Sequence, residues 1–121
     1  MALMESAARV AWPPAVEVFG DCSWRPTSSD HAVVDMRGEI DAFAIPSLAR
    51  CVDEAIAAGH GHVVLDLADI DFIDSSGLAA IVRAGKRMAG LGGSVSMRRP
   101  SARIHRVLDI VGLTAFVPLE D

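Results

Sequence analysis

Apolar positions change their spacing along the chain, and these changes predict strands that alternate with helices. Short apolar runs, or apolar residues at every second position, indicate strands at 15–20 with an irregular continuation to Trp24, at 31–37, at 62–66 and at 94–97. A last strand is expected at 115–118, and the turn-forming composition of residues 26–30 joins the first two strands in a hairpin. The run at 62–66 is apolar on both faces, which is typical of a covered central strand.

Apolar residues three and four positions apart predict three helices between these strands. They are expected between Leu48 and Gly59, between Leu78 and Gly90, and between Ser101, which can cap the helix, and Gly112. A proline is tolerated only in the first turn of a helix. The first helix therefore begins either irregularly at Asp41, whose carboxylate can cap it, or near Pro46.

The order of these elements predicts one α/β domain. Alternation after the hairpin implies a mixed sheet of four to five strands, joined by crossover helices that pack mainly on one face. We assign the domain to residues 15–121 and a flexible leader to residues 1–14, which end in Pro13-Pro14. The sequence shows no internal repeat and no second domain.

Composition narrows the class of protein. The chain has 121 residues, of which 51% are hydrophobic and 22% charged, as in a globular domain with its own core. A net charge of −5 argues against nucleic acid as the main partner. We expect a cytoplasmic, reduced protein without a signal peptide or membrane span, in which Cys51 is a small buried apolar residue rather than a metal or redox group.

The stretch from Val63 to Leu78 runs from a buried strand into a helix, and small polar residues fill the junction. Asp74, Ser75 and Ser76 precede Gly77 directly at the expected helix start. Unpaired backbone N–H groups and the helix dipole favour an anion at such a start. From local chemistry alone, simple helix capping by these residues is the favoured explanation. A regulatory phosphate on Ser75 is the functional alternative.

The segment Asp74 to Leu78 resembles the phosphorylation motif of anti-sigma factor antagonists, which are small members of the STAS family. Three further segments match in the same order: Gly38 to Asp41 resembles the family's Gly-Glu-Leu-Asp turn, Gly92-Gly93 precedes the fourth strand, and 101–113 resembles the late helix and its turn. The resemblance covers nearly the whole chain after the leader. It implies the STAS fold for residues 15–121.

The resemblance also implies a mechanism. Ser75 would accept phosphate, with Asp41 and Asp74 as its acidic neighbours, and Glu39, Ser76 and Gly77 would complete the partner-binding surface. The partners would be an anti-sigma factor with serine kinase activity and a phosphatase acting on phospho-Ser75. ATP and Mg²⁺ would belong to the kinase, so this chain is expected to be no enzyme and to hold no cofactor or metal. The alternative is a STAS scaffold subunit of a larger regulatory or transport assembly, without Ser75 phosphorylation.

Several of these residues can be explained by a structural role as well as by a functional one. Asp41 can serve as a helix cap as well as a partner contact, Ser76 as a packing or capping residue, and Gly77 as a point of close approach to the partner or to the adjacent strand. Glu39, Asp69 and Asp71 are expected to be solvated loop charges that a basic partner could read. The basic cluster Arg98, Arg99, Arg103 and Arg106 is expected to be a solvated face, and Trp12 and Trp24 either pack on the sheet or contact a partner.

Other chemistries fit the sequence less well. Residues 73–77 lack the Gly-x-Ser-x-Gly elbow of a serine hydrolase, and no histidine is expected opposite Ser75. Asp66, at the expected end of a central strand, could resemble the acceptor of a receiver domain. However, Lys86 is the only lysine and falls within a helix, and the required acidic pair is missing. The His60-Gly61-His62 pair lacks further metal ligands, and no phosphate-binding P-loop occurs.

Overall fold

A β-hairpin opens the part of the chain that the structure describes. In the computed structural model, which describes residues 21–120, β1 (Asp21–Pro26) pairs antiparallel with β2 (His31–Ile40). The turn between them is closed by the Thr27 N–H, which donates to the His31 carbonyl at 2.9 Å. The predicted hairpin is confirmed. The predicted strand residues 15–20, the leader and Trp12 lie outside the described residues.

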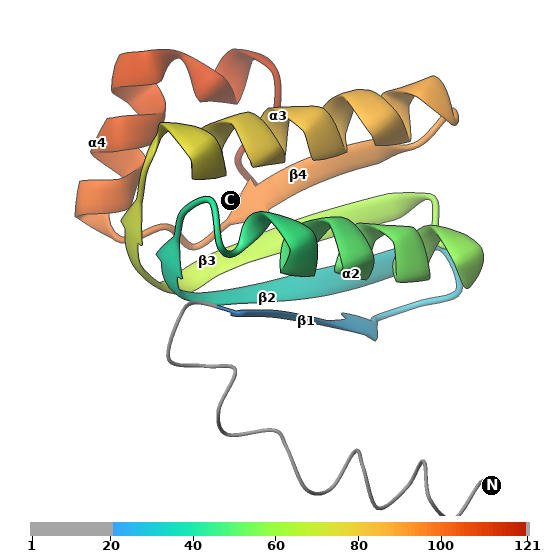
Figure 1. Ribbon diagram of the computed structural model, residues 1–121. Helices are drawn as coiled ribbons and strands as arrows, with labels where there is room; N and C mark the ends of the chain where they lie inside the picture. Colours follow the sequence, from blue (N-terminus) through green and yellow to red (C-terminus); the bar gives the residue numbers. More distant parts are fainter. Residues whose placement is uncertain (1–20, 121) are drawn as a thin grey trace, which may run out of the picture.

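The remaining strands lie parallel to β2 and complete a mixed sheet. After β2 come α2 (Ile45–Ala57), β3 (His62–Ile73), α3 (Ser75–Gly90) and β4 (Ser94–Arg98). The strand order is β1-β2-β3-β4, with β2, β3 and β4 parallel. Helices α2 and α3 lie side by side over one face of this sheet (Figure 1). The predicted α/β architecture, with a four-stranded mixed sheet and helices mainly on one face, is confirmed.

The main core lies between the sheet and these two helices. Its side chains come from alternate positions of the strands and from the inner helix faces: Ala32, Val34, Met36, Val63, Leu65, Leu67, Leu48, Cys51, Val52, Ala55, Ala80, Ile81, Ala84 and Met88. Removing this apolar surface from water is the main force that holds the layers together. Cys51 is buried here as predicted, and its thiol donates to the Cys22 carbonyl at 3.3 Å.

The start of α2 decides between the two predicted boundaries. The helix begins at Ile45, with Pro46 in its first turn, and the Ala44 that precedes it makes no side-chain cap. The prediction that Asp41 caps this helix is wrong. The Asp41 carboxylate instead accepts the Phe43 N–H at 3.0 Å, and the Asp41 carbonyl accepts the Ala44 N–H at 3.0 Å. Pro46 fits only the first turn, so the helix starts later and residues 41–44 form a separate turn.

The C-terminal segment differs from its prediction in one respect. Helix α4 (Ala102–Val111) begins, as expected, at Ser101, whose Oγ accepts the Ile104 N–H at 3.2 Å, and ends at Gly112 with φ of 72°. The strand predicted at 115–118 is replaced by a 3₁₀ turn, η2 (Leu113–Ala115). Leu113 and Val117 are both buried, and the Val117 N–H donates to the Leu113 carbonyl at 3.0 Å, a local hydrogen bond that an extended strand could not form. Only Leu119 then pairs with β4, at Met97.

Candidate functional site at the start of helix α3

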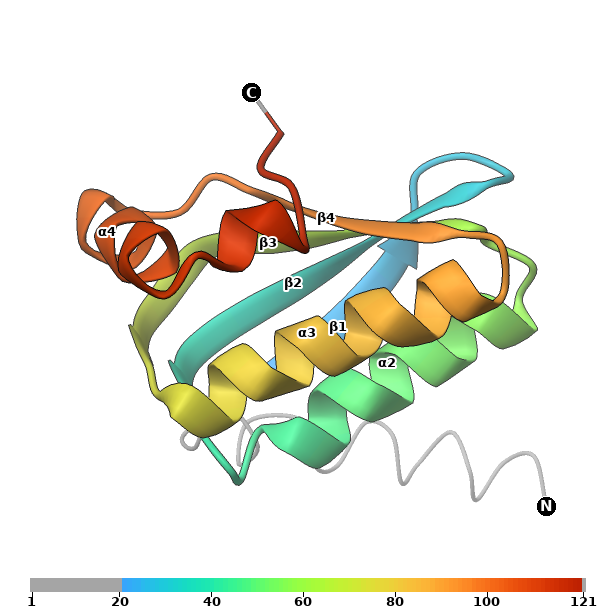
Figure 2. The same ribbon diagram turned by 90° about the horizontal axis from the view of Figure 1, so that it is seen from above.

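Strands β2 and β3 end side by side, and this places the two turns that hold the predicted site residues next to each other. Ile40 and Ile73 are paired in the parallel ladder, and the Asp74 N–H donates to the Ile40 carbonyl at 3.3 Å. The turn 41–44 follows β2 and the start of α3 follows β3, so both lie at one end of the sheet (Figures 1 and 2). The fold therefore brings together the predicted Asp41 and Asp74 regions.

Gly77 makes this close approach possible. A Cβ atom at this position would overlap the Ile40 carbonyl oxygen and would lie 2.8 Å from Ile73 Cγ1. The first turn of α3 thus packs against the backbone of β2, and the lack of a side chain at Gly77 is a packing requirement. Of the two predicted close approaches, the structure shows the one to the adjacent strand. The residue is buried and offers little surface to a partner.

Asp74 caps α3, and this leaves the serines uninvolved in capping. Asp74 has extended backbone angles, and its Oδ1 accepts the Gly77 N–H at 3.0 Å. Ser75 is the first helical residue and is exposed, while Ser76 is half-buried. Neither hydroxyl makes a hydrogen bond with any residue of 21–120. The Ser75 Oγ consequently lies at the positive end of the helix dipole with no structural task.

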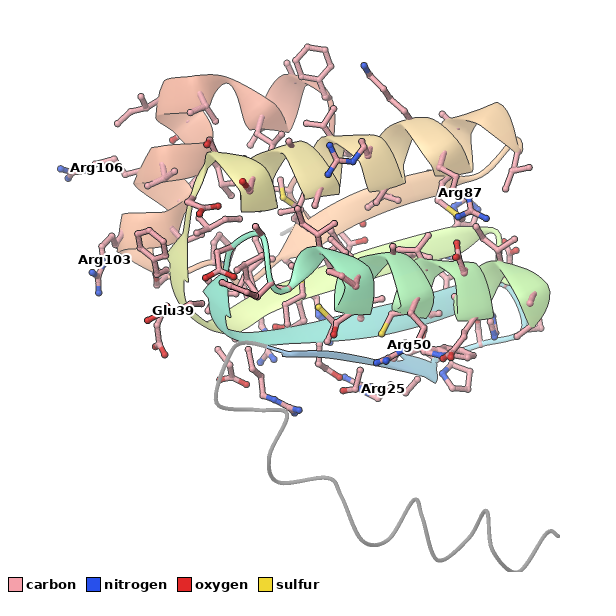
Figure 3. All side chains as sticks on the ribbon, viewed as in Figure 1. Arg25, Glu39, Arg50, Arg87, Arg103 and Arg106 are labelled. Carbon is pink, nitrogen blue, oxygen red and sulfur yellow. The ribbon has the colours of Figure 1, made fainter. Side chains whose placement is uncertain are left out.

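Acidic side chains surround this helix start. Glu39 and Asp71 are exposed, Asp41 and Asp74 are half-buried, and within residues 21–120 none of the four forms an ion pair. Glu39 extends away from the sheet at this end, and Arg103 and Arg106 of α4 extend outward from the same end (Figure 3). Glu39, Asp69 and Asp71 lie on strands β2 and β3, so their expected place in loops is wrong. Their exposure agrees with the expected solvation.

Sequence reasoning missed two exposed aromatic side chains in this region. Phe43 is 81% exposed and Phe72 is 50% exposed, although each stands within a few residues of buried core positions. The signal was present in the sequence, since Phe43 falls between the predicted strand and the helix face, and Phe72 falls directly before the Asp74 motif. An apolar residue outside the periodic core pattern is a candidate contact for a binding partner.

Asp66 lies on the face of the sheet opposite to α2 and α3, because it alternates with the core residues Leu65 and Leu67, and it has a different environment. It does not end its strand, as the sequence suggested, because β3 continues to Ile73. Its Oδ2 accepts hydrogen bonds from Arg98 Nε at 2.9 Å and from Arg99 Nη2 at 2.8 Å. Its Oδ1 accepts the Ala68 N–H at 3.0 Å. With both oxygens engaged, Asp66 is a structural ion-pair centre, unlike a receiver-domain acceptor.

Burial and hydrogen bonding act in opposite directions on this carboxyl. Burial by itself would raise the pKa of Asp66, but the hydrogen bonds from Ala68, Arg99 and Arg98 together lower that pKa below its usual 3.8. Arg99 reaches the carboxylate from a left-handed backbone conformation with φ of 57°, which is unfavourable for a residue with a side chain. The expectation of a solvated basic face is borne out for Arg99, Arg103 and Arg106, which are exposed, although Arg99 also pairs with Asp66. It is wrong for Arg98, which is half-buried against Asp66.

The histidines and tryptophan do not assemble a catalytic site around Ser75. His31 and His62 stack at 4.7 Å between ring centres at the amino ends of β2 and β3, opposite the α3 start. His60 is buried against Trp24, whose indole N–H donates to Glu54 Oε1 at 2.8 Å. Within residues 21–120 no three His, Cys, Asp or Glu side chains are grouped to hold a metal ion. No helix of that region is long and apolar enough to cross a bilayer.

Comparison with known proteins agrees with this geometry. The family model described as "STAS domain" matches residues 25–121. The chain belongs to the STAS domain family. The anti-sigma F factor antagonist of Paenibacillus polymyxa is 33% identical over 90 residues, which are 74% of this STAS chain and 77% of the relative.

Two solved structures share the fold of this STAS domain. SpoIIAA, an anti-sigma factor antagonist solved in its unphosphorylated form, aligns with a TM-score of 0.69 and 17% identity over 83% of this chain and 88% of its own. The phosphorylated form of SpoIIAA, from Bacillus, aligns with a TM-score of 0.64 and 19% identity over 83% and 91%. The same STAS fold is thus seen in a protein solved with and without phosphate.

Proposed function

We propose that this STAS domain is an anti-sigma factor antagonist controlled by phosphorylation of Ser75. The main support for the proposal is that Asp74, and not Ser75, caps helix α3, which leaves Ser75 exposed. A serine that merely capped the helix would have its oxygen engaged with a backbone N–H, as Ser101 does at α4. The name of the Paenibacillus polymyxa relative supports the same role.

The chemistry of the site accounts for a switch that acts on binding rather than on folding. Phosphorylation adds about −1.5 to −2 charges at neutral pH. The helix dipole and unpaired N–H groups at the α3 start tolerate that charge, so the domain stays folded. Asp74, Asp41 and Glu39 make the surrounding surface more negative still. A partner docked over Ser75 loses complementarity through repulsion, bulk and the cost of removing water from the phosphate.

In this proposal the unphosphorylated domain binds an anti-sigma factor that is also a serine kinase, and so releases a sigma factor for transcription. Phosphate transfer from ATP to Ser75 ends the complex, and a separate phosphatase restores it. This chain is substrate and ligand rather than enzyme, and it acts in the cytoplasm. Residues 15–121 form the binding domain, Glu39, Asp41, Asp74 and Ser76 contribute to its contact surface, and residues 1–14 form a leader.

Incubation with candidate anti-sigma factor kinases and ATP, followed by peptide mass spectrometry, tests the proposal. We expect one phosphate on the wild type, none on Ser75→Ala, and normal modification of the neighbouring control Ser76→Ala. Unmodified wild type, or equal modification of Ser75→Ala, contradicts the switch. If the unmodified wild type forms stable complexes that Ser75→Asp also forms, the scaffold alternative holds instead.

A further inference from the structure

Large apolar side chains are exposed at several places on residues 21–120, and two of them flank the Ser75 site. The exposed set comprises Phe43, Phe72, Leu91, Ile110, Val111 and Phe116. Phe43 lies in the turn after β2, and Phe72 is the last residue but one of β3. These two segments are the ones joined by the Ile40–Ile73 pairing. Exposed aromatic residues at one end of a sheet are typical of protein-binding surfaces.

Phe43 is held outward by a constrained turn. The Asp41 carboxylate accepts the Phe43 N–H at 3.0 Å, and the turn is closed by the Ala44 N–H, which donates to the Asp41 carbonyl at 3.0 Å. Ala44 itself is buried, so the turn is anchored to the core directly after Phe43. An aromatic side chain presented on a fixed backbone loses little conformational entropy when a partner covers it.

Phe72 is exposed because β3 is irregular near its end. Between Asp35 and Arg37, and again between Gly38 and Glu39, β3 contributes one more residue to the pairing than β2 does. Extra residues of this kind re-aim side chains, and here Asp71 and Phe72 are both exposed between the buried Ile70 and Ile73. Across the ladder Phe72 is paired with Glu39. The aromatic ring therefore has a carboxylate next to it in the chain and another across the strand pair.

We propose that Phe43 and Phe72 are the apolar anchors by which this domain binds its anti-sigma factor, and that Asp41 is a positioning residue that fixes Phe43. The inference rests on the proposed function and adds the kind of surface that the partner must present. That surface has apolar pockets for two aromatic rings, and basic groups at its rim that meet Glu39 and Asp71. A phosphate on Ser75 lies at the same end of the sheet as the two anchors, and a partner that covers this end would have to remove water from the phosphate.

Isothermal titration of a candidate anti-sigma factor kinase, without ATP, into the full-length chain tests the anchors. We expect Phe43→Ala and Phe72→Ala each to weaken Kd by 10-fold or more, as at interface hot spots. Phe116→Ala and Leu91→Ala are matched controls, since these side chains are 71% and 62% exposed and lie elsewhere, and they should stay within about 2-fold of wild type. Thermal unfolding should show all four variants folded.

The outcomes separate the two proposals. If wild type binds and is phosphorylated, and Phe43→Ala and Phe72→Ala bind no more weakly than the controls, the anchor proposal is overturned. The proposed function is then left intact. Failure of wild type to bind or be phosphorylated by every candidate overturns the proposed function and the anchors with it. Sedimentation that shows a wild-type dimer dissociated by Phe43→Ala would assign the aromatic pair to a second copy of the chain and would also overturn the inference.

Asp41 needs its own comparison because its charge and its acceptor oxygen can be separated. Asp41→Asn keeps an oxygen for the Phe43 N–H and removes the charge, whereas Asp41→Ala removes both. Because Asp41 also belongs to the proposed contact surface, we expect Asp41→Asn to weaken Kd by about 3-fold through the lost charge, and Asp41→Ala, which also releases Phe43, to weaken it by about 10-fold. Equal losses in the two variants would show that the charge itself contacts the partner, and would overturn the positioning role.

Discussion

Two aspartates on one continuous segment, Asp66 and Asp74, accept similar local hydrogen bonds but lie in opposite electrostatic surroundings. Asp66 Oδ1 accepts the N–H of Ala68, and Asp74 Oδ1 accepts the N–H of Gly77, both at 3.0 Å. The second oxygen of Asp66 binds two arginine side chains. Asp74 has no ion pair within residues 21–120. The fold neutralises one carboxylate and leaves the other with uncompensated charge.

The difference follows from how deeply each carboxylate is buried. Asp66 is only 3% exposed, and a buried carboxylate requires charge-assisted hydrogen bonds to be tolerated. Asp74 is half-buried at a helix N-terminus, where water and the helix dipole suffice. A further negative group can be added next to Asp74 without disturbing an ion pair of the fold. In the proposed switch, added charge at the α3 start therefore changes what the surface binds and leaves the core as it was.

The largest loss of stability should come from Gly77→Ala, which forces the start of α3 away from β2. The new Cβ would overlap the Ile40 carbonyl, a backbone atom that cannot move without shifting the strand end. We expect a loss of roughly 3 kcal/mol in unfolding free energy by urea titration. Gly90→Ala is the matched control on the same helix, because nothing lies within 4 Å of its Cβ, and it should be neutral or slightly stabilising. Equal stability of the two variants would contradict the packing role of Gly77.

Asp66→Asn should cause the second-largest loss of stability. The pH dependence of that loss should show that it comes from the ionised carboxylate. The native pKa of Asp66 lies below 3.8, so the ionised carboxylate stabilises the fold above about pH 4 and loses that contribution as the pH falls through the lower native pKa. At pH 7 we expect Asp66→Asn to lose about 2 kcal/mol, a difference that narrows toward pH 3. Asp53→Asn, which breaks an exposed pair with Arg87, should lose less than about 0.5 kcal/mol. A difference at position 66 that does not change with pH would contradict the ion-pair account.

Removal of the cap at α3 should have a smaller effect. Asp74→Ala leaves the Gly77 N–H without its side-chain acceptor, and a loss of about 1 kcal/mol is expected. Asp74→Ser retains a capping oxygen and should recover most of that loss. Ser75→Ala should change unfolding free energy by less than about 0.5 kcal/mol, because its hydroxyl has no partner in residues 21–120. A larger loss for Ser75→Ala than for Asp74→Ala would reverse the assignment of cap and acceptor.

Much of the fold followed from residue periodicity, because buried faces of strands and helices repeat at fixed intervals. The hairpin, the helix α4 with its Ser101 cap and the α3 start were predictable in this way. The turn at Asp41 could not be predicted in this way, because an Asp side chain forms the same hydrogen bond when it caps a helix and when it closes a turn. Only the position of Pro46 distinguishes the turn from a helix cap.

The residues of the candidate site could be predicted, but not their arrangement. The roles of Ser75 and its acidic neighbours stay a prediction from the motif, whereas the exposure of Phe72 depends on the extra residues in β3, which alternation patterns do not encode. The pairing of Asp66 with Arg98 and Arg99 also depends on the strand register, in which Asp66 and Arg98 become neighbours although they are far apart in the sequence. Strand register, rather than a local pattern, therefore determines both of these features.

Ser75→Asp should have the smallest effect on stability and the clearest effect on binding. A negative side chain in the first turn of α3 gains from the helix dipole and is repelled by Asp74, so we expect unfolding free energy within about 0.5 kcal/mol of wild type. Binding to the anti-sigma factor should nevertheless be lost in titration calorimetry. Ser101→Asp is the control, since it places the same charge at the α4 start, where Asp can replace the serine as cap. If Ser101→Asp abolished binding equally, net charge rather than the Ser75 site would control the partner.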